Sequence, residues 1–228
     1  MNELSNCLSL FEKSFFFALK KDEKLNTDLE QLQAKIIYSD VVNSFHPKRK
    51  NEFILGRICA SKAYASCMNG TELLSLPSNK DRSPCWPLGI IGSITHDQLW
   101  VGAAVAKNSD LLAIGIDLEM KGRTKLRLAS HIRGPADMLS HPQLSDEELL
   151  TLIFSCKESL YKALYPSVKK YFGFKDAALR SIDLQRGVFT IDLLTSLNEN
   201  FGPSSRHSFN GRFMMNDQTC LTVLEIIL

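Results

Sequence analysis

Two acidic side chains lie two positions apart in residues 115–119, which read GIDLE. The hydrophobic neighbours predict a β-strand, in which residues two apart share a face. Asp117 and Glu119 would then point to one side, while Ile116 and Leu118 point to the core. Two parallel carboxylates repel each other unless solvent or a cation separates them, and magnesium favours such oxygen ligands beside phosphate. The pattern alone favours a solvated strand face over a metal site.

An acid and a base lie four positions apart in residues 154–162, which read FSCKESLYK. Helical spacing places Glu158 and Lys162 opposite an apolar stripe. The stripe consists of Leu149, Ile153, Cys156, Leu160 and Leu164. Spacing alone favours an ordinary surface ion pair, because the acid precedes the base. Phe154 and Tyr161 argue against that reading, since large rings beside the charges suggest a helix covered on both sides.

Two further groups of residues carry donors suited to phosphate. One expected strand ends in Thr95 and His96, a hydroxyl and an imidazole. A helix expected over residues 46–68 carries Arg49 and Arg57, whose guanidinium groups can bind phosphate with two hydrogen bonds. The ordinary alternatives are a turn histidine in the first case and a solvated basic run in the second.

Caps and periodicity predict the elements that must position these residues. Ser145 and Glu148 form a capping-box pattern that begins a helix extending to about Leu164. Strand patterns cover residues 90–96, 99–106, 111–120, 177–185, 187–195, 211–216 and 220–228. The stretch 25–39 has mixed helical spacing. Each half offers a helix and antiparallel-looking strands without βα alternation, which predicts an α+β fold.

Composition narrows the class of protein. The 228 residues fit two intimate halves or two separable domains, and 44% hydrophobic with 23% charged residues is typical of a soluble globular chain. A net charge of +2 gives no field that would favour nucleic acid. We expect a cytoplasmic protein, because no signal-like or membrane-spanning run is found. The six cysteines form no CxxC pair and predict no zinc site.

The order and wording of the motifs resemble the 4′-phosphopantetheinyl transferases, most closely the siderophore-synthetase branch named for the enterobactin enzyme. The matching segments are EFILGR (52–57), DRSPCWP (81–87), GIIGSITH (89–96), GIDLE (115–119) and FSCKESLYKA (154–163). The likeness spans about residues 49–163. Thr95 stands where serine is common and Cys156 where alanine is common, and both replacements are close in size.

The resemblance implies a monomer with a pseudo-twofold, made of two similar α+β halves, 1–110 and 111–228, with the active site and coenzyme A in the cleft between them. The implied metal ligands, for Mg2+, are Asp117, Glu119 and Glu158. The implied coenzyme A contacts are Arg49, Arg57, Arg82, Thr95, His96, Lys157 and Lys162. Glu158 would also act, directly or through a water, as base toward a serine hydroxyl, and Lys162 would neutralise the leaving phosphate.

The implied reaction moves the phosphopantetheine arm of coenzyme A onto a serine of an apo acyl or peptidyl carrier protein and releases 3′,5′-ADP. Siderophore, polyketide and polyunsaturated fatty acid synthases all need this modification, and the sequence does not choose among them. Two alternatives remain. A magnesium phosphoesterase would use water in place of serine, and a coenzyme A or carrier-binding module without activity would need a broken motif, whereas all the acids and Lys162 are present.

Overall fold

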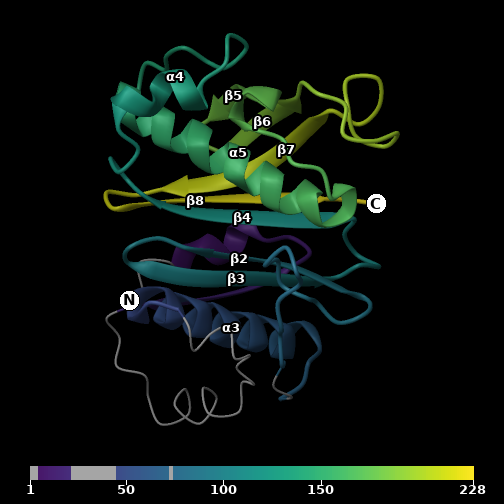
Figure 1. Ribbon diagram of the computed structural model, residues 1–228. Helices are drawn as coiled ribbons and strands as arrows, with labels where there is room; N and C mark the ends of the chain where they lie inside the picture. The colour runs from purple at the N-terminus through teal and green to yellow at the C-terminus, as the bar shows by residue number, and fades with distance from the viewer. Residues whose placement is uncertain (1–4, 22–44, 72–73) are drawn as a thin grey trace. The chain divides into compact units, whose positions relative to one another are not determined.

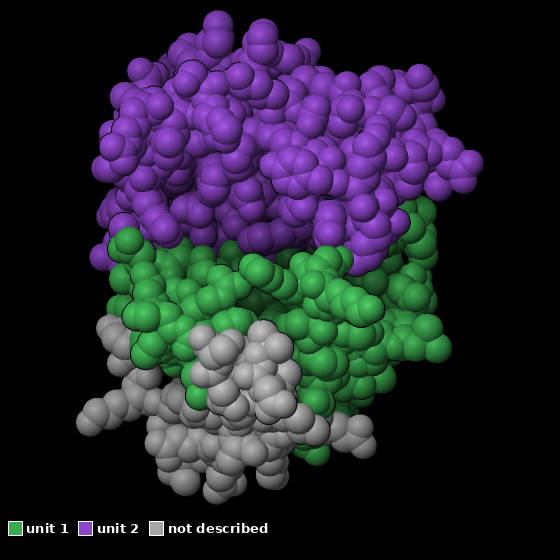
Figure 2. All heavy atoms as spheres, in the orientation of Figure 1, with its two compact units in different colours: residues 1–114, 227–228 green, residues 115–226 purple. Residues whose placement is uncertain are grey.

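The chain divides into two compact units, shown in different colours in Figure 2. The computed structural model describes residues 5–21, 45–71 and 74–228. Unit 1 comprises residues 1–114 with 227–228, and unit 2 comprises residues 115–226. The stretch 25–39, for which the sequence indicated mixed helical spacing, lies outside the described residues. Within the described part of the chain, no helix is long and apolar enough to cross a membrane.

Unit 1 is a three-stranded antiparallel sheet with one long helix packed against it. Its elements are the 3-10 helix η1 (Ser5–Leu10), β1 (Phe15–Lys20), α3 (Pro47–Cys67), β2 (Ile90–His96) and β3 (Trp100–Lys107). The strand order is β1-β3-β2, with Phe17 opposite Ala103 and Ser93 opposite Ala104. Helix α3 runs along the sheet (Figure 1) and buries Ile54 and other apolar residues there.

The helix expected over residues 46–68 is confirmed as α3. Pro47 occupies its first turn, where proline's missing N–H leaves no hydrogen bond unmade. The helix lies close to the sheet at Gly56, where a Cβ atom would come within 3.0 Å of Ile94 Cγ2. A larger residue there would crowd the Ile94 side chain of β2, the strand that carries Thr95 and His96.

Unit 2 is a five-stranded sheet with a long helix across one face (Figure 1). Its elements are β4 (Ala113–Met120), η2 (Leu126–Leu128), α4 (Ala129–Ile132), α5 (Asp146–Val168), η3 (Phe174–Asp176), β5 (Ala177–Asp183), β6 (Val188–Leu193), β7 (Ser208–Met215) and β8 (Thr219–Ile226). The strand order is β4-β8-β7-β6-β5, and the pairs from β5 to β8 are antiparallel. Helices and antiparallel sheets in both units confirm the α+β fold class.

The predicted capping box begins α5. The Ser145 hydroxyl accepts from the Glu148 backbone N–H at 3.3 Å, and the Ser145 N–H donates to Glu148 Oε2 at 2.7 Å. Lys121 Nζ lies 2.7 Å from the other carboxylate oxygen. The hydrogen bonds from Lys121 and Ser145 lower the pKa of Glu148 to about 2. This cap fixes the point at which the helix bearing Glu158 and Lys162 begins.

Candidate functional site

Helix α5 is covered on most of its surface. The predicted apolar stripe is buried, and so are Ser155, Lys157 and Ser159 on other sides of the helix. Phe154 packs on Phe174 at 5.2 Å between ring centroids, and Tyr161 stacks on Tyr165 at the same separation. The segment 154–162 therefore does not lie on a helix with one solvated face.

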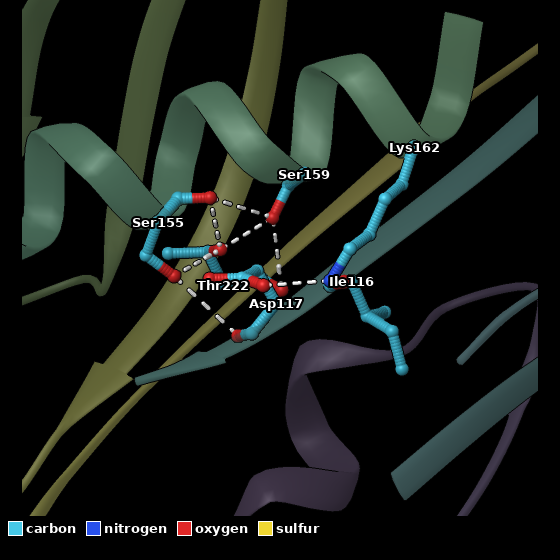
Figure 3. Close-up of polar contacts among 6 residues, drawn as sticks. All are labelled: Ile116, Asp117, Ser155, Ser159, Lys162 and Thr222. Carbon is cyan, nitrogen blue, oxygen red and sulfur yellow. Dashed lines mark hydrogen bonds and ion pairs between the residues drawn. The ribbon is translucent and has the colours of Figure 1, made fainter. Parts of the chain in front are cut away.

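Lys162 reaches the acidic strand rather than open solvent. Its Nζ donates to Asp117 Oδ1 at 2.7 Å and to the Ile116 carbonyl oxygen at 3.1 Å, as Figure 3 shows. Asp117 is only 4% exposed, which rules out the solvated strand face as a description of this residue. A buried carboxylate requires a charged or hydrogen-bonding partner, and Lys162 supplies one across 45 positions of sequence.

The predicted strand is confirmed as β4, and it meets α5 through residues two apart. Gly115 and Asp117, two residues apart, both meet α5: a Cβ on Gly115 would lie 2.7 Å from Ala163 N, and Asp117 binds Lys162. Glu119 is half-buried, while Ile116 and Leu118 are fully buried. The face of β4 with Gly115 and Asp117 therefore meets the helix, and strand alternation predicts Glu119 on the same face.

Glu158 lies beside a cavity and close to other charges of the site. Burial raises its pKa, the neighbouring Asp117 charge raises it further, and Lys162 opposes both effects. The cavity has a volume of about 180 Å³. Its walls are formed by Lys157, Glu158, Tyr161, Tyr171, Phe172, Gly173, Phe174 and Ala177. A carboxylate at an aromatic wall is suited to accept a proton from a group that enters this space.

The candidate acids have the ligand type that a hard cation such as magnesium prefers, but by themselves they do not form a complete coordination shell. Asp117, Glu119 and Glu158 offer the carboxylate oxygens that magnesium prefers. Among the described residues, however, no group of three His, Cys, Asp or Glu side chains is gathered closely enough to hold a metal ion. Oxygens from a bound phosphate and from water would have to complete the coordination shell.

Lys157 is held inside unit 2 by three oxygen atoms. Its Nζ donates to Asp137 Oδ2 at 2.6 Å, to the Ile132 carbonyl at 2.9 Å and to the Phe174 carbonyl at 2.8 Å. Burial lowers its pKa, while Asp137 opposes that shift. Asp137 in turn accepts from the backbone N–H groups of Gly134 and Leu179, both at 2.7 Å. These contacts tie α5 to its surroundings, and contact with a pyrophosphate stays a prediction.

Thr95 and His96 end strand β2 of unit 1, as expected. Thr95 is buried, whereas the side chain of His96 is 48% exposed. His96 Nδ1 lies 3.9 Å from Glu52 Oε2, and Glu52 also binds Lys21 at 2.8 Å through its other oxygen. Glu52 of α3 therefore places a negative charge near Nδ1 of the accessible His96 ring. The sequence did not predict this contact.

The two arginines of α3 alternate with aromatic rings at four-residue intervals. Arg49 lies over the Phe45 ring at 5.1 Å, Phe45 meets Phe53 at 5.9 Å, and Arg57 lies over Phe53 at 4.0 Å. Arg49 is exposed, but Arg57 is only 5% exposed. Burial lowers the pKa of Arg57 to about 10, so it stays charged at neutral pH. Only Arg49 presents an open guanidinium.

Arg57 also fixes a loop. Its Nε donates to the Leu76 carbonyl and its Nη2 to the Ser78 hydroxyl, both at 2.9 Å. The same loop continues to Arg82, which is exposed and has a left-handed φ of 68°. Its turn is closed by a hydrogen bond from Arg82 N to Asn79 O at 2.9 Å. Arg57 therefore helps to place the segment that leads to Arg82.

An acidic strand paired with a lysine-bearing helix, in an α+β chain, provides the groups of a phosphate-handling enzyme. Residues 38–106 match the family model of the 4′-phosphopantetheinyl transferase N-terminal domain, and residues 113–215 match that of the 4′-phosphopantetheinyl transferase superfamily. The chain is 30% identical over 209 residues to 4′-phosphopantetheinyl transferase Npt of Nocardia iowensis, covering 86% of this chain and 90% of the relative.

Two more relatives support membership in the same family. The chain is 32% identical over 184 residues to 4′-phosphopantetheinyl transferase Svp of Streptomyces mobaraensis, covering 79% of this chain and 73% of the relative. It is 34% identical over 150 residues to enterobactin synthase component D of Salmonella typhimurium, covering 64% and 60%. The chain belongs to the 4′-phosphopantetheinyl transferase family, and the resemblance to its enterobactin-type branch is confirmed.

Proposed function

We propose that the protein transfers the 4′-phosphopantetheine group of coenzyme A to a serine hydroxyl of an apo acyl or peptidyl carrier protein and releases 3′,5′-ADP. Family membership supports the transfer. The observation that carries the proposal is the 2.7 Å contact between Lys162 and the buried Asp117. It places a cation and a carboxylate, both from motifs of the family, at one point of unit 2.

Glu158 would act as the base. As the serine oxygen bonds to phosphorus, the hydroxyl proton must leave, and a carboxylate with a raised pKa is a stronger base than an exposed one. The bond from phosphorus to the ADP oxygen then breaks, and negative charge develops on the leaving phosphate. The Lys162 ammonium would stabilise that charge. Rigid elements favour this chemistry, because positioning contributes much of the rate of phosphoryl-type transfer.

Asp117, Glu119 and Glu158 would hold Mg2+. When bound, the ion would neutralise the pyrophosphate of coenzyme A, whose own oxygens would complete the coordination. The buried position of Asp117 supports this assignment, as does the charge of Asp117 acting on Glu158, although burial is the larger cause of the raised pKa of Glu158. Lys162, which binds Asp117 at 2.7 Å, would supply positive charge to the same phosphate.

Residues of unit 1 would bind the remainder of coenzyme A. His96 and Thr95 would contact its phosphates, and the exposed Arg49 and Arg82 would bind the 3′-phosphate and adenine end. We propose that Arg57 serves the same end indirectly, through the loop that it anchors. The placement of coenzyme A in a cleft between the two halves stays a prediction.

The aromatic cavity beside Glu158 is suited to the pantetheine arm, because an extended amide chain can lie against aromatic rings. The similarity to enterobactin synthase component D supports a siderophore synthetase as acceptor, with polyketide and polyunsaturated fatty acid synthases as the alternatives. Action as a monomer in the cytoplasm stays a prediction.

The test is incubation with coenzyme A, Mg2+ and a panel of apo carrier proteins, followed by mass spectrometry of each carrier. We expect one phosphopantetheine to be added to a serine by the wild type. Asp117→Asn should abolish the addition and leave the thermal midpoint nearly unchanged. Asp192→Asn is the matched control, because Asp192 forms only a 3.4 Å surface contact with Arg180 in the same unit. Release of phosphopantetheine without any modified carrier would favour the phosphoesterase.

A further inference from the structure

Three buried hydroxyl groups join helix α5 to strand β8 (Figure 3). Ser155, Ser159 and Thr222 are each 0% exposed. The Thr222 hydroxyl donates to the Ser155 carbonyl at 3.0 Å and lies 2.9 Å from the Ser155 hydroxyl. The Ser159 hydroxyl also contacts the Thr222 hydroxyl, and it lies 3.0 Å from the Ser155 carbonyl. We call these three residues the hydroxyl cluster.

The hydroxyl cluster lies next to Asp117 and Lys162 of the proposed site. Ser155, Ser159 and Lys162 are at positions i, i+4 and i+7 and therefore follow one stripe of α5. The Ser155 hydroxyl lies 3.5 Å from the Asp117 carbonyl oxygen, while Lys162 binds the Asp117 side chain at 2.7 Å. Helix α5 therefore contacts both the main-chain carbonyl and the side-chain carboxylate of Asp117.

No side chain separates strand β4 from this stripe of α5 at Gly115. Gly115 has no side chain, and a Cβ there would overlap the Ser159 carbonyl oxygen and lie 2.7 Å from Ala163 N. Backbone therefore packs on backbone where the acidic strand passes α5. At such a contact no large side chain fixes how far the helix can slide along the strand.

Hydrogen bonds of the buried hydroxyl groups can fix the position of α5 along the strand, which backbone packing at Gly115 does not. Burying a hydroxyl is unfavourable unless it is hydrogen-bonded, and a bonded network tolerates few alternative alignments. We propose that Ser155, Ser159 and Thr222 are positioning residues that fix the register of α5 against β4 and β8, so that Lys162 and Glu158 stay aligned with Asp117. This proposal rests on the proposed function, because the register matters through the transfer reaction.

The critical variant is Thr222→Val, which removes one hydroxyl and keeps the shape of the side chain. A displacement of about 1 Å can lower a rate by about a hundredfold, so we expect the single-turnover transfer rate to fall by roughly tenfold or more. The dissociation constant for coenzyme A should change much less than the rate, since the cluster is not placed in the binding of the 3′-phosphate and adenine end. Thr222→Ser restores the hydroxyl and should recover most of the rate.

Thr151→Val is the matched control. Thr151 is also 0% exposed and lies one turn before Ser155, but its hydroxyl donates only to the Glu147 carbonyl of its own helix, at 2.8 Å. We expect this variant to lose stability as Thr222→Val does and to keep the wild-type rate. Equal rates in the two variants, or an equal loss in both, would overturn the proposal. Ser155→Ala takes the place of Thr222→Val if that variant fails to fold.

Hydrogen exchange gives a readout that is independent of turnover. We expect Thr222→Val, but not Thr151→Val, to speed amide exchange in peptides covering residues 115–118 and 155–162. Lys162→Met serves as the inactive reference. If the wild type modifies carriers and Thr222→Val matches Thr151→Val in rate and exchange, the proposed function stands and the register proposal fails. If the wild type modifies no carrier, the proposed function itself fails.

Discussion

At the scale of single residues, the chemistry depends on how burial changes Glu158. An exposed glutamate is a weak base near neutral pH, because its pKa lies well below the working range. Burial and the adjacent Asp117 raise the pKa of Glu158, and Lys162 only partly opposes them. The folded state therefore binds a proton on Glu158 more tightly than the unfolded chain does, and ionising this residue destabilises the fold.

Glu158→Gln should lower the single-turnover rate by about a hundredfold, as expected for a lost general base. In the wild type, the rate should rise with pH through the raised pKa of Glu158, and this acid limb should be absent in the variant. Stability at neutral pH should not fall, because the stabilising effect of a raised carboxyl pKa is present at low pH and is lost as pH rises through it.

The measurements are a pH–rate profile of transfer beside urea melts at neutral pH. Glu147→Gln, in the first turn of the same helix, is the control and should keep both the rate and the acid limb. An unchanged acid limb in Glu158→Gln would assign the base to another group.

The sequence indicated the burial and the local spacing of the candidate residues better than it indicated their partners. The strand pattern was sufficient to predict β4, the strand that carries Asp117 and Glu119. Helical spacing, however, offered Glu158 as the partner of Lys162, whereas the structure pairs Lys162 with Asp117. No local pattern indicates a contact across 45 residues. For the same reason, the sequence did not predict that Asp137, 20 residues earlier, binds Lys157.

At the scale of elements, local signals were reliable and long-range pairing was not. The capping box and Pro47 predicted where α5 and α3 begin, because caps act within one turn. Strand β1 was not predicted: residues 15–20 showed only a short apolar run, and they become a strand by pairing with β3, some 85 positions later. The order that places β4 beside β8 likewise depends on contacts between the two ends of unit 2.

Arg57→Ala should destabilise unit 1 by about 2 kcal/mol, because it removes a buried cation and leaves the Leu76 carbonyl without its donor. Arg57→Lys should not restore the stability, since an ammonium cannot reproduce the two directed bonds of a guanidinium. Thermal or urea melts measure both variants. Ser78→Ala removes only one acceptor and should cost less. A fully stable Arg57→Ala would show that the loop is not held by this residue.

At the scale of the whole molecule, the two units supply different kinds of groups. Unit 2 carries the acids and Lys162, with Glu158 at the wall of a cavity, while unit 1 carries exposed cations on α3 and the following loop. The proposed function assigns the reacting phosphate to unit 2 and the distant, unreactive end of coenzyme A to unit 1. Substitutions should therefore separate into two kinetic classes according to the unit in which they lie.

Arg49→Ala tests this division, because Arg49 is exposed and its observed contact is with the Phe45 ring. We expect the Michaelis constant for coenzyme A to rise by roughly tenfold with little change in turnover, since binding of an unreactive group is lost equally from the ground state and the transition state. Dephospho-coenzyme A lacks the 3′-phosphate and should be affected much less. Arg186→Ala, at a side chain 83% exposed in unit 2, controls for the loss of one positive charge and should behave as wild type. An equal loss on both substrates would show that Arg49 does not bind the 3′-phosphate, and a fall in turnover alone would place it with the reacting groups.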